Sequence, residues 1–178
     1  MRPTLALLAL GLLAVLVQGG LAHLVPGRAV PDLSLLLTLA AALVLGAGSG
    51  LLVAAGVGLG ADMVSGTLLG QLACLRVLEV VVTRAIAGQL DLRRGLPLAV
   101  FAFALVFLDG IGQAALSWLF LGEFPLQPGE LLGLGVRAAV TAPFAPLVGA
   151  VARRISDRLD ESEARREMRL DTRRSVLR

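Results

Sequence analysis

The sequence contains no lysine, one cysteine and one histidine. Without lysine, its glycine-rich segments cannot form a phosphate-binding P-loop, in which a lysine follows the glycines and contacts the phosphates. Cys74 has no second cysteine to pair with, which excludes a disulfide within the chain. Cys74 and His23 are far apart in the sequence and are too few ligands for a zinc site. The sequence therefore predicts neither a metal site nor a cofactor site.

Charged residues are scarce as well. Only 16% of the 178 residues are charged and 57% are hydrophobic, whereas a soluble domain has roughly 25% charged and about 45–50% apolar residues. A soluble domain of this size leaves roughly 30% of its chain surface in water, so such an apolar excess must face something else. We therefore predict an all-α integral membrane protein, a polytopic bundle of transmembrane helices.

Apolar segments recur from Thr4 to Val151 and are separated by short polar or glycine-rich stretches. Residues 1–152 are enough for about six crossings of roughly 20 residues each, and we assign them to a transmembrane domain. Residues 153–178 contain no apolar run long enough to enter a bilayer, so we expect a charged cytoplasmic tail. The expected helices are Thr4–Ala22, Leu33–Leu45, Leu51–Val64, Leu68–Leu90, Pro97–Leu121 and Leu131–Ala152.

Glycine and proline indicate where these helices bend. The glycine-rich segment from Gly46 to Gly50 predicts the bend of a tight helical hairpin. Pro143 and Pro146 lie inside the last expected helix, where we predict a kink or a break. The first helix, with Ala22 at its end, also has the pattern of a secretory signal, and that alternative stays open.

Arginine is distributed unevenly over the two sides of the expected six-helix topology. One side carries Arg2, Arg93, Arg94 and the nine arginines of the tail, whereas the other carries only Arg28. Because arginine accumulates in cytoplasmic loops, both termini are predicted to be cytoplasmic. Acidic residues alternate with the tail arginines, which is typical of a solvated helix rather than a nucleic-acid-binding surface.

Six ionisable residues fall at the expected membrane depth. They are Asp62, Arg76, Glu79, Arg84, Asp109 and Arg137. One charge at a helix centre costs about 2.5–3.5 kcal/mol on insertion scales, so these three acids and three arginines are expected to pair, line a wet cavity or reach an interface. Arg76, Glu79 and Thr83 are spaced by three and four residues, which predicts one stripe that faces protein. Arg84 is expected to reach the cytoplasmic interface.

Two interpretations of the polar residues remain open. One is a structural polar core that fixes helix register; the other is a pocket or a partner-binding face. The candidates for the second are Asp62, Arg76, Glu79, Thr83, Asp109 and Arg137. Two aspartates within the membrane are also typical of aspartyl intramembrane proteases, but that chemistry needs Asp62 and Asp109 to share one site.

Glycine recurs at a spacing of four residues in Gly46/Gly50, Gly56/Gly60 and Gly66/Gly70. Such pairs let two helix backbones approach closely within a membrane. We expect them to serve packing within the chain, with self-association or partner docking as the alternatives.

The segment from Gly58 to Gly70, GLGADMVSGTLLG, resembles the G-L-x-x-D-x-x-S-G-x-x-L-G signature of the bacterial rod shape-determining membrane protein MreD family. The segment from Pro31 to Leu37, PDLSLLL, resembles the entry to that family's second helix. The signature residues in this chain are Gly58, Gly60, Asp62, Ser65, Gly66 and Gly70. Within the signature we expect Asp62 to cap the following turn by accepting from N–H groups near Ser65 and Gly66, and Gly66 to adopt a positive φ.

The resemblance implies a fold similar to the six-helix substrate-binding subunits of energy-coupling-factor transporters. It also implies a non-enzymatic subunit of the cell-elongation, or rod, complex that supports peptidoglycan synthesis and cell shape. The implied partners are the bitopic protein MreC, the RodA glycan polymerase with its penicillin-binding transpeptidase, and the MreB filament. The alternative is a transporter subunit whose Arg76, Glu79, Asp109 and Arg137 line a cavity for a small molecule. An intramembrane enzyme is the third hypothesis.

Overall fold

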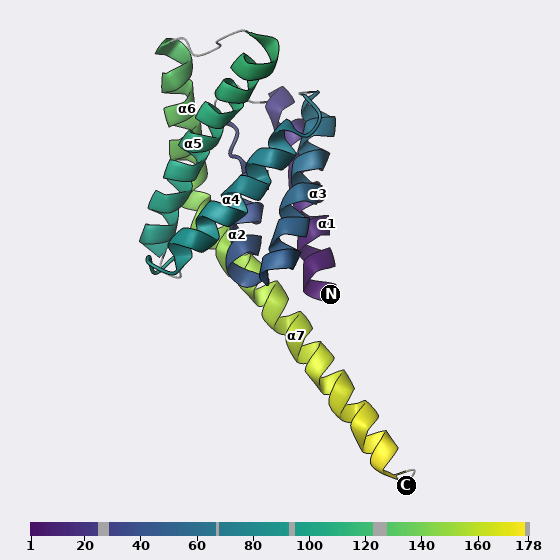
Figure 1. Ribbon diagram of the computed structural model, residues 1–178. Helices are drawn as coiled ribbons and strands as arrows, with labels where there is room; N and C mark the ends of the chain where they lie inside the picture. The colour runs from purple at the N-terminus through teal and green to yellow at the C-terminus, as the bar shows by residue number, and fades with distance from the viewer. Residues whose placement is uncertain (25–28, 67, 93–94, 123–127, 177–178) are drawn as a thin grey trace.

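The computed structural model describes residues 1–24, 29–66, 68–92, 95–122 and 128–176, with side chains as far as residue 160. Over these residues it is entirely helical, without a strand. In chain order (Figure 1) the helices are α1 (Arg2–Leu24), α2 (Leu33–Val44), α3 (Ala47–Ser65), α4 (Gln71–Ala87), α5 (Gly95–Leu121), α6 (Pro128–Thr141), a 3₁₀ turn (Ala142–Phe144) and α7 (Ala145–Val176).

Helix α2 lies at the centre of the bundle. It packs against α1, α3, α4 and the first part of α7, while α5 and α6 lie side by side on the other side of α4 (Figure 1). Nine consecutive residues of α2, from Ser34 to Ala42, are buried. Its apolar sequence therefore serves contacts with protein on all sides rather than contact with lipid.

Among the residues that the structure describes, four helical segments are long and apolar enough to cross a membrane. They are α1, α3, α5 and the segment Gly129–Asp160, which comprises most of α6, the 3₁₀ turn and the first part of α7. Two of the six crossings expected from the sequence do not meet this criterion. Helix α2 has only 12 residues, and the 17 residues of α4 include several charges. At 1.5 Å per residue α2 is about 18 Å long, against a hydrocarbon core of about 30 Å. The fold is thus a helical membrane bundle with two short inner helices.

Helix α1 is the most exposed of the four candidate crossings. Only 17% of its apolar window is buried within the bundle. Large apolar side chains such as Leu5, Leu13 and Leu16 are exposed on its outer face. An outer face of this composition is suited to lipid or to a helix of another membrane protein.

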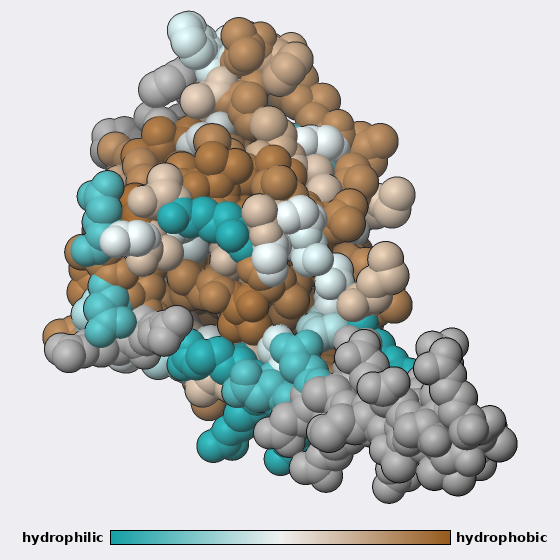
Figure 2. All heavy atoms as spheres, turned by 60° about the horizontal axis from the view of Figure 1, so that its bottom comes forward, coloured by the Kyte–Doolittle hydropathy of each residue, from teal (hydrophilic) through white to brown (hydrophobic). Residues whose placement is uncertain are grey.

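The predicted break near Pro143 is confirmed. Helix α6 ends at Thr141, Pro143 lies in the 3₁₀ turn, and α7 begins at Ala145. Proline has no backbone N–H to donate to the preceding turn, so the α-helical hydrogen bonding is interrupted there. Helix α7 then runs past residue 153 without interruption, so no helix end marks the expected start of the tail. Hydrophilic residues gather beside α7 at the end of the bundle that it leaves (Figure 2).

The predicted hairpin bend is shorter than expected. Only Leu45 and Gly46 separate α2 from α3, and Gly48 and Gly50 already lie in the first turns of α3. Gly46 is the N-cap residue of α3 in an extended conformation. The hairpin itself is therefore confirmed, but four of its five expected residues are helical.

The glycine pairs serve different purposes. A Cβ on Gly56 would lie 2.7 Å from Leu8, and one on Gly60 would lie 2.5 Å from Leu12. This pair therefore allows the close approach of α3 to α1, as the packing hypothesis predicts. Gly66 and Gly70 are not a helix interface, because they have left-handed backbone conformations with φ of 65° and 93° and form the turn between α3 and α4.

Candidate functional site

Arg76, a buried arginine of α4, contacts three carboxylates. One lies on its own helix, one at the start of α2 and one on α5. Arg76 is 1% exposed, and its Nη1 lies 3.2 Å from Glu79 Oε2 and 3.1 Å from Asp109 Oδ1. Its Nη2 lies 3.1 Å from Asp32 Oδ2. We call these residues, together with Arg137, the Arg76 cluster. Because α2, α4, α5 and α6 all contribute to it, the cluster fixes the relative positions of four helices.

Asp32 is the most highly connected carboxylate of the Arg76 cluster. It is the N-cap residue of α2, and its Oδ1 accepts from the Leu35 N–H at 3.0 Å and from the Ser34 hydroxyl at 2.8 Å. Its Oδ2 accepts from Arg76 and, at 2.5 Å, from Arg137 Nη2. A buried carboxylate is tolerated when both oxygens are hydrogen-bonded and paired in this way.

Asp32 is the functional candidate that the sequence analysis did not identify, because it was assigned to the loop before the second helix. Its side chain is 0% exposed. An aspartate directly before an apolar helical run is an N-cap signal, and that signal was available in the sequence. What the sequence did not reveal is that α2 begins inside the bundle, so that its N-cap residue is buried with it.

Polar side chains around the Arg76 cluster add further hydrogen bonds to it. Gln113 Nε2 donates to Asp109 Oδ2 at 2.7 Å. The Thr38 hydroxyl lies 3.0 Å from Glu79 Oε2 and 2.8 Å from the Leu35 carbonyl oxygen. The Asp32 N–H donates to Thr141 Oγ1 at 3.0 Å. These contacts extend the network from α2 to α5 and to the end of α6.

The Arg76 cluster does not consist of the three acids and three arginines expected from the sequence. Asp62 and Arg84 bind elsewhere, and Asp32 joins instead, so that three carboxylates face two guanidinium groups. The predicted stripe on α4 is confirmed, because Glu79 is 5% exposed and Thr83 is 0% exposed. Arg84 Nη2 donates to the Leu45 carbonyl oxygen and so binds the end of α2.

Asp62 has a separate role at the start of α4. Its carboxylate accepts from the N–H groups of Gly70 at 2.8 Å, Leu72 at 2.9 Å and Ala73 at 3.3 Å. The expected partners near residues 65 and 66 are therefore wrong, since the Gly66 N–H donates to the backbone carbonyl of Asp62. A carboxylate suits the first turn of a helix, where N–H groups lack partners within the helix and the helix dipole is positive.

The other signature residues build the same corner between α3 and α4. Gly66 ends α3 with a positive φ, as predicted. A Cβ on Gly58 would lie 2.4 Å from Ala73 Cα, so only glycine allows this close crossing of the two helices. The Ser65 hydroxyl donates to the Ala61 carbonyl at 2.7 Å. The contacts of Asp62 and Asp109 thus involve different partners, and the shared site that an aspartyl protease needs is not formed by these contacts.

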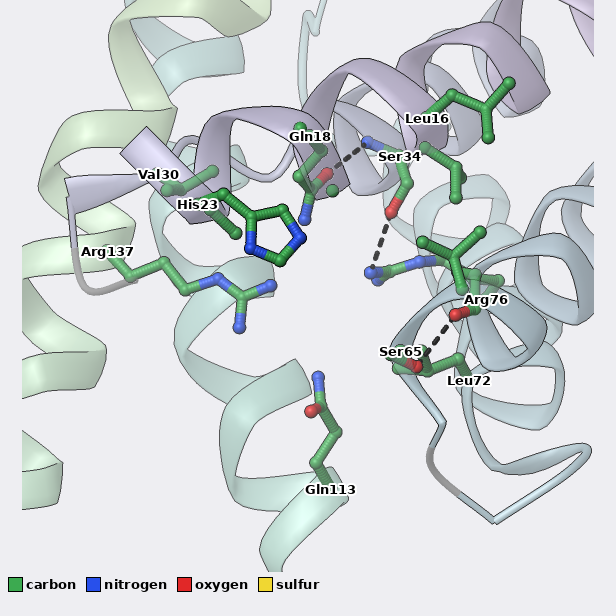
Figure 3. Close-up of a pocket in the computed structure, with 16 residues that line it drawn as sticks. Leu16, Gln18, His23, Val30, Ser34, Ser65, Leu72, Arg76, Gln113 and Arg137 are labelled. Atoms are coloured by element: carbon green, nitrogen blue, oxygen red, sulfur yellow. Dashed lines mark hydrogen bonds between the residues drawn. The ribbon is translucent and has the colours of Figure 1, made fainter. Parts of the chain in front are cut away.

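A cavity of about 660 Å³ lies in front of the Arg76 cluster. Figure 3 shows the side chains of Gln18, His23, Arg76, Gln113 and Arg137 converging on it from α1, α4, α5 and α6. Apolar residues of α1 and α3, including Val15 and Val64, form the remaining wall. Of the four residues that the sequence predicted to line a ligand cavity, Arg76 and Arg137 do so.

The polar groups at this cavity include several hydrogen-bond donors. Arg137 uses Nη2 for Asp32, which leaves Nε and Nη1 for another acceptor. Gln18 Oε1 accepts from the Ser34 N–H at 3.3 Å, which leaves its amide nitrogen as a donor. Within the part of the chain that the structure describes, no group of three or more His, Cys, Asp and Glu side chains is arranged to hold a metal ion. The arrangement suits a small ligand that accepts hydrogen bonds.

Comparison with protein-family models, with curated proteins and with solved structures finds no match for this chain.

Proposed function

We propose that this protein is a non-enzymatic scaffold subunit of a bacterial cell-elongation complex, similar to the MreD family. In this proposal it lies in the cell inner membrane with both termini in the cytoplasm. Its six membrane segments have the fold of energy-coupling-factor substrate-binding subunits. It binds an MreC-like bitopic protein through lateral helix contacts and, with it, the RodA glycan polymerase, its transpeptidase and the MreB filament.

The observation that carries the proposal is the structural coherence of the signature segment. Asp62 and Gly58 hold the start of α4 against α3, and Gly66 and Gly70 form the turn between the two helices. A structural role of this kind for the signature residues supports a scaffold, which needs a fixed bundle architecture. The exposed apolar face of α1 supports the proposed mode of binding, because helices associate in membranes through packing of such faces.

Site-specific photo-crosslinking in intact cells tests this proposal. A photo-reactive residue is placed at exposed positions such as Leu13 of α1 and Val100 of α5, and at the buried position Val53 as the control. The expected result is a crosslink to an MreC-like protein from at least one exposed position and none from Val53. Failure to co-purify any MreC-like protein, together with normal cell shape after depletion, would contradict the proposal.

The second candidate function is a ligand-binding subunit of a membrane transporter. It is favoured by the cavity of about 660 Å³ and by the free donors of Arg137. Native mass spectrometry of the purified protein tests it, with Arg137→Gln as the variant and the exposed Arg158→Gln as the matched control. A small molecule lost only in Arg137→Gln, or an associated ATPase, supports this candidate over the scaffold.

A further inference from the structure

The charges of the Arg76 cluster do not balance if every member is ionised. Asp32, Glu79 and Asp109 would contribute three negative charges, and Arg76 and Arg137 two positive charges. Both Arg76 and the carboxylates are at most 5% exposed, so water cannot screen the excess negative charge. Leaving an uncompensated charge in such surroundings costs several kcal/mol. One additional positive charge, of which a proton is the smallest, removes this cost.

Only one carboxylate oxygen in the cluster has no hydrogen-bond partner among the described residues. Both oxygens of Asp32 accept hydrogen bonds, and so do both oxygens of Asp109. Glu79 Oε2 accepts from Arg76 and Thr38, but Glu79 Oε1 is buried without a partner among the described residues. Glu79 is therefore the member at which a proton gives a donor to a buried oxygen that otherwise has no partner.

An acceptor for the same proton lies one helical turn further along α4. Thr83 Oγ1 is also buried and also without a partner among the described residues. Residues four apart on a helix share a face, so Glu79 and Thr83 lie on the same buried stripe of α4. A hydroxyl can accept as well as donate, so Thr83 Oγ1 can accept from a protonated Glu79 Oε1 and give both atoms a partner.

We propose that Glu79 carries a proton on Oε1 and donates it to Thr83 Oγ1, so that the Arg76 cluster is electrically neutral. Glu79 is faced by Arg76 on its own helix, by Thr38 of α2 and, across Arg76, by Asp32 and Asp109. With the proton in place, two carboxylates remain for two guanidinium groups. The proposal concerns a proton-binding site and does not depend on the function proposed above.

Infrared spectroscopy of the full chain in lipid bilayers at neutral pH tests for this proton directly. A protonated carboxylic acid has a C=O stretch separate from the bands of carboxylates and amides. We expect this band in the unmodified protein, its loss in Glu79→Gln, and its retention in Glu130→Gln, which removes an exposed glutamate. An isotopic label in the carboxyl carbon of glutamate alone must shift the band, which assigns the band to a glutamate rather than to an aspartate even if the variant fails to fold. Absence of the band, or a band that the label leaves unmoved, overturns the proposal.

Substitution of Thr83 tests the proposed acceptor. Thr83→Val keeps the shape of the side chain and removes the oxygen, so the band should move to a higher frequency as the hydrogen bond is lost. Thr83→Ser keeps the hydroxyl and should keep the original frequency. A band that does not move in Thr83→Val shows that the proton is not donated to Thr83 and refutes that contact.

Discussion

Asp32→Asn is the substitution that tests the Arg76 cluster most directly. The Asn side chain has nearly the same shape as Asp and keeps an oxygen that can accept from the Leu35 N–H, so the cap of α2 is retained. What it loses is the negative charge between Arg76 and Arg137. The change therefore separates the pairing of charges from the capping of the helix.

The expected cost follows from the partners that remain. Removing one member of a buried ion pair costs about 3–5 kcal/mol. Arg76 keeps the charge of Asp109 and its contact with Glu79 Oε2, and the Arg137 side chain is 26% exposed, so both arginines retain some compensation. We expect a loss near the lower bound, about 3 kcal/mol, which reduces the folding equilibrium constant roughly a hundredfold. Asp32→Ala also removes the cap and should cost about 1 kcal/mol more.

Equilibrium unfolding in mixed micelles, followed by circular dichroism, measures these differences. The matched control is Asp157→Asn, which removes an exposed aspartate of α7 and should change the free energy of unfolding by less than about 0.5 kcal/mol. A double-mutant cycle with Arg137→Gln gives the coupling between the two residues, because the loss of the Asp32–Arg76 contact is common to the single and the double variant and cancels.

Two results would refute this reasoning. The first is an Asp32→Asn protein whose free energy of unfolding is the same as that of the Asp157→Asn control. The second is a coupling energy of zero between Asp32 and Arg137, because it would mean that their contact at 2.5 Å contributes nothing to stability.

Three further predictions concern the corner between α3 and α4. Gly58→Val should separate the helices and cost about 1–3 kcal/mol or prevent folding, because a Cβ would lie 2.4 Å from Ala73 Cα. The control is Gly48→Ala, where a Cβ has nothing within 4 Å; it should be neutral or stabilising in the same unfolding assay. Asp62→Leu should abolish accumulation of the protein in membranes. Asp62→Asn should accumulate to an intermediate level, since it keeps one of two accepting oxygens. Equal levels of the two variants would contradict the capping. Gly66→Ala should destabilise the protein by about 1 kcal/mol and so lower its thermal midpoint, because φ at this position is 65°. An unchanged midpoint would argue against strain there.

Much of the helical arrangement could be predicted from the sequence. The apolar runs and the spacing of Arg76, Glu79 and Thr83 gave correct helices and a correct buried stripe, because both depend on residues near one another in the chain. The break near Pro143 likewise has a local cause.

The composition of the Arg76 cluster could not be predicted in the same way. Whether a residue next to an apolar run is buried depends on where that helix begins within the bundle, which only the packing of α2 determines. Asp32 was therefore assigned to a loop although it is 0% exposed. Asp62 was assigned to the same group of charges as Glu79, although its hydrogen bonds to the first turn of α4 come from residues 8 to 11 positions later in the chain.

The wide sequence separation of the Asp32 contacts has a consequence for biogenesis. Arg76 lies 44 residues after Asp32, and Arg137 lies 105 residues after it. As the ribosome delivers the chain, α2 enters the membrane well before either counterion exists, so its first position there is provisional. A chain that stops short of α6 retains a buried aspartate without Arg137, one of its two counterions.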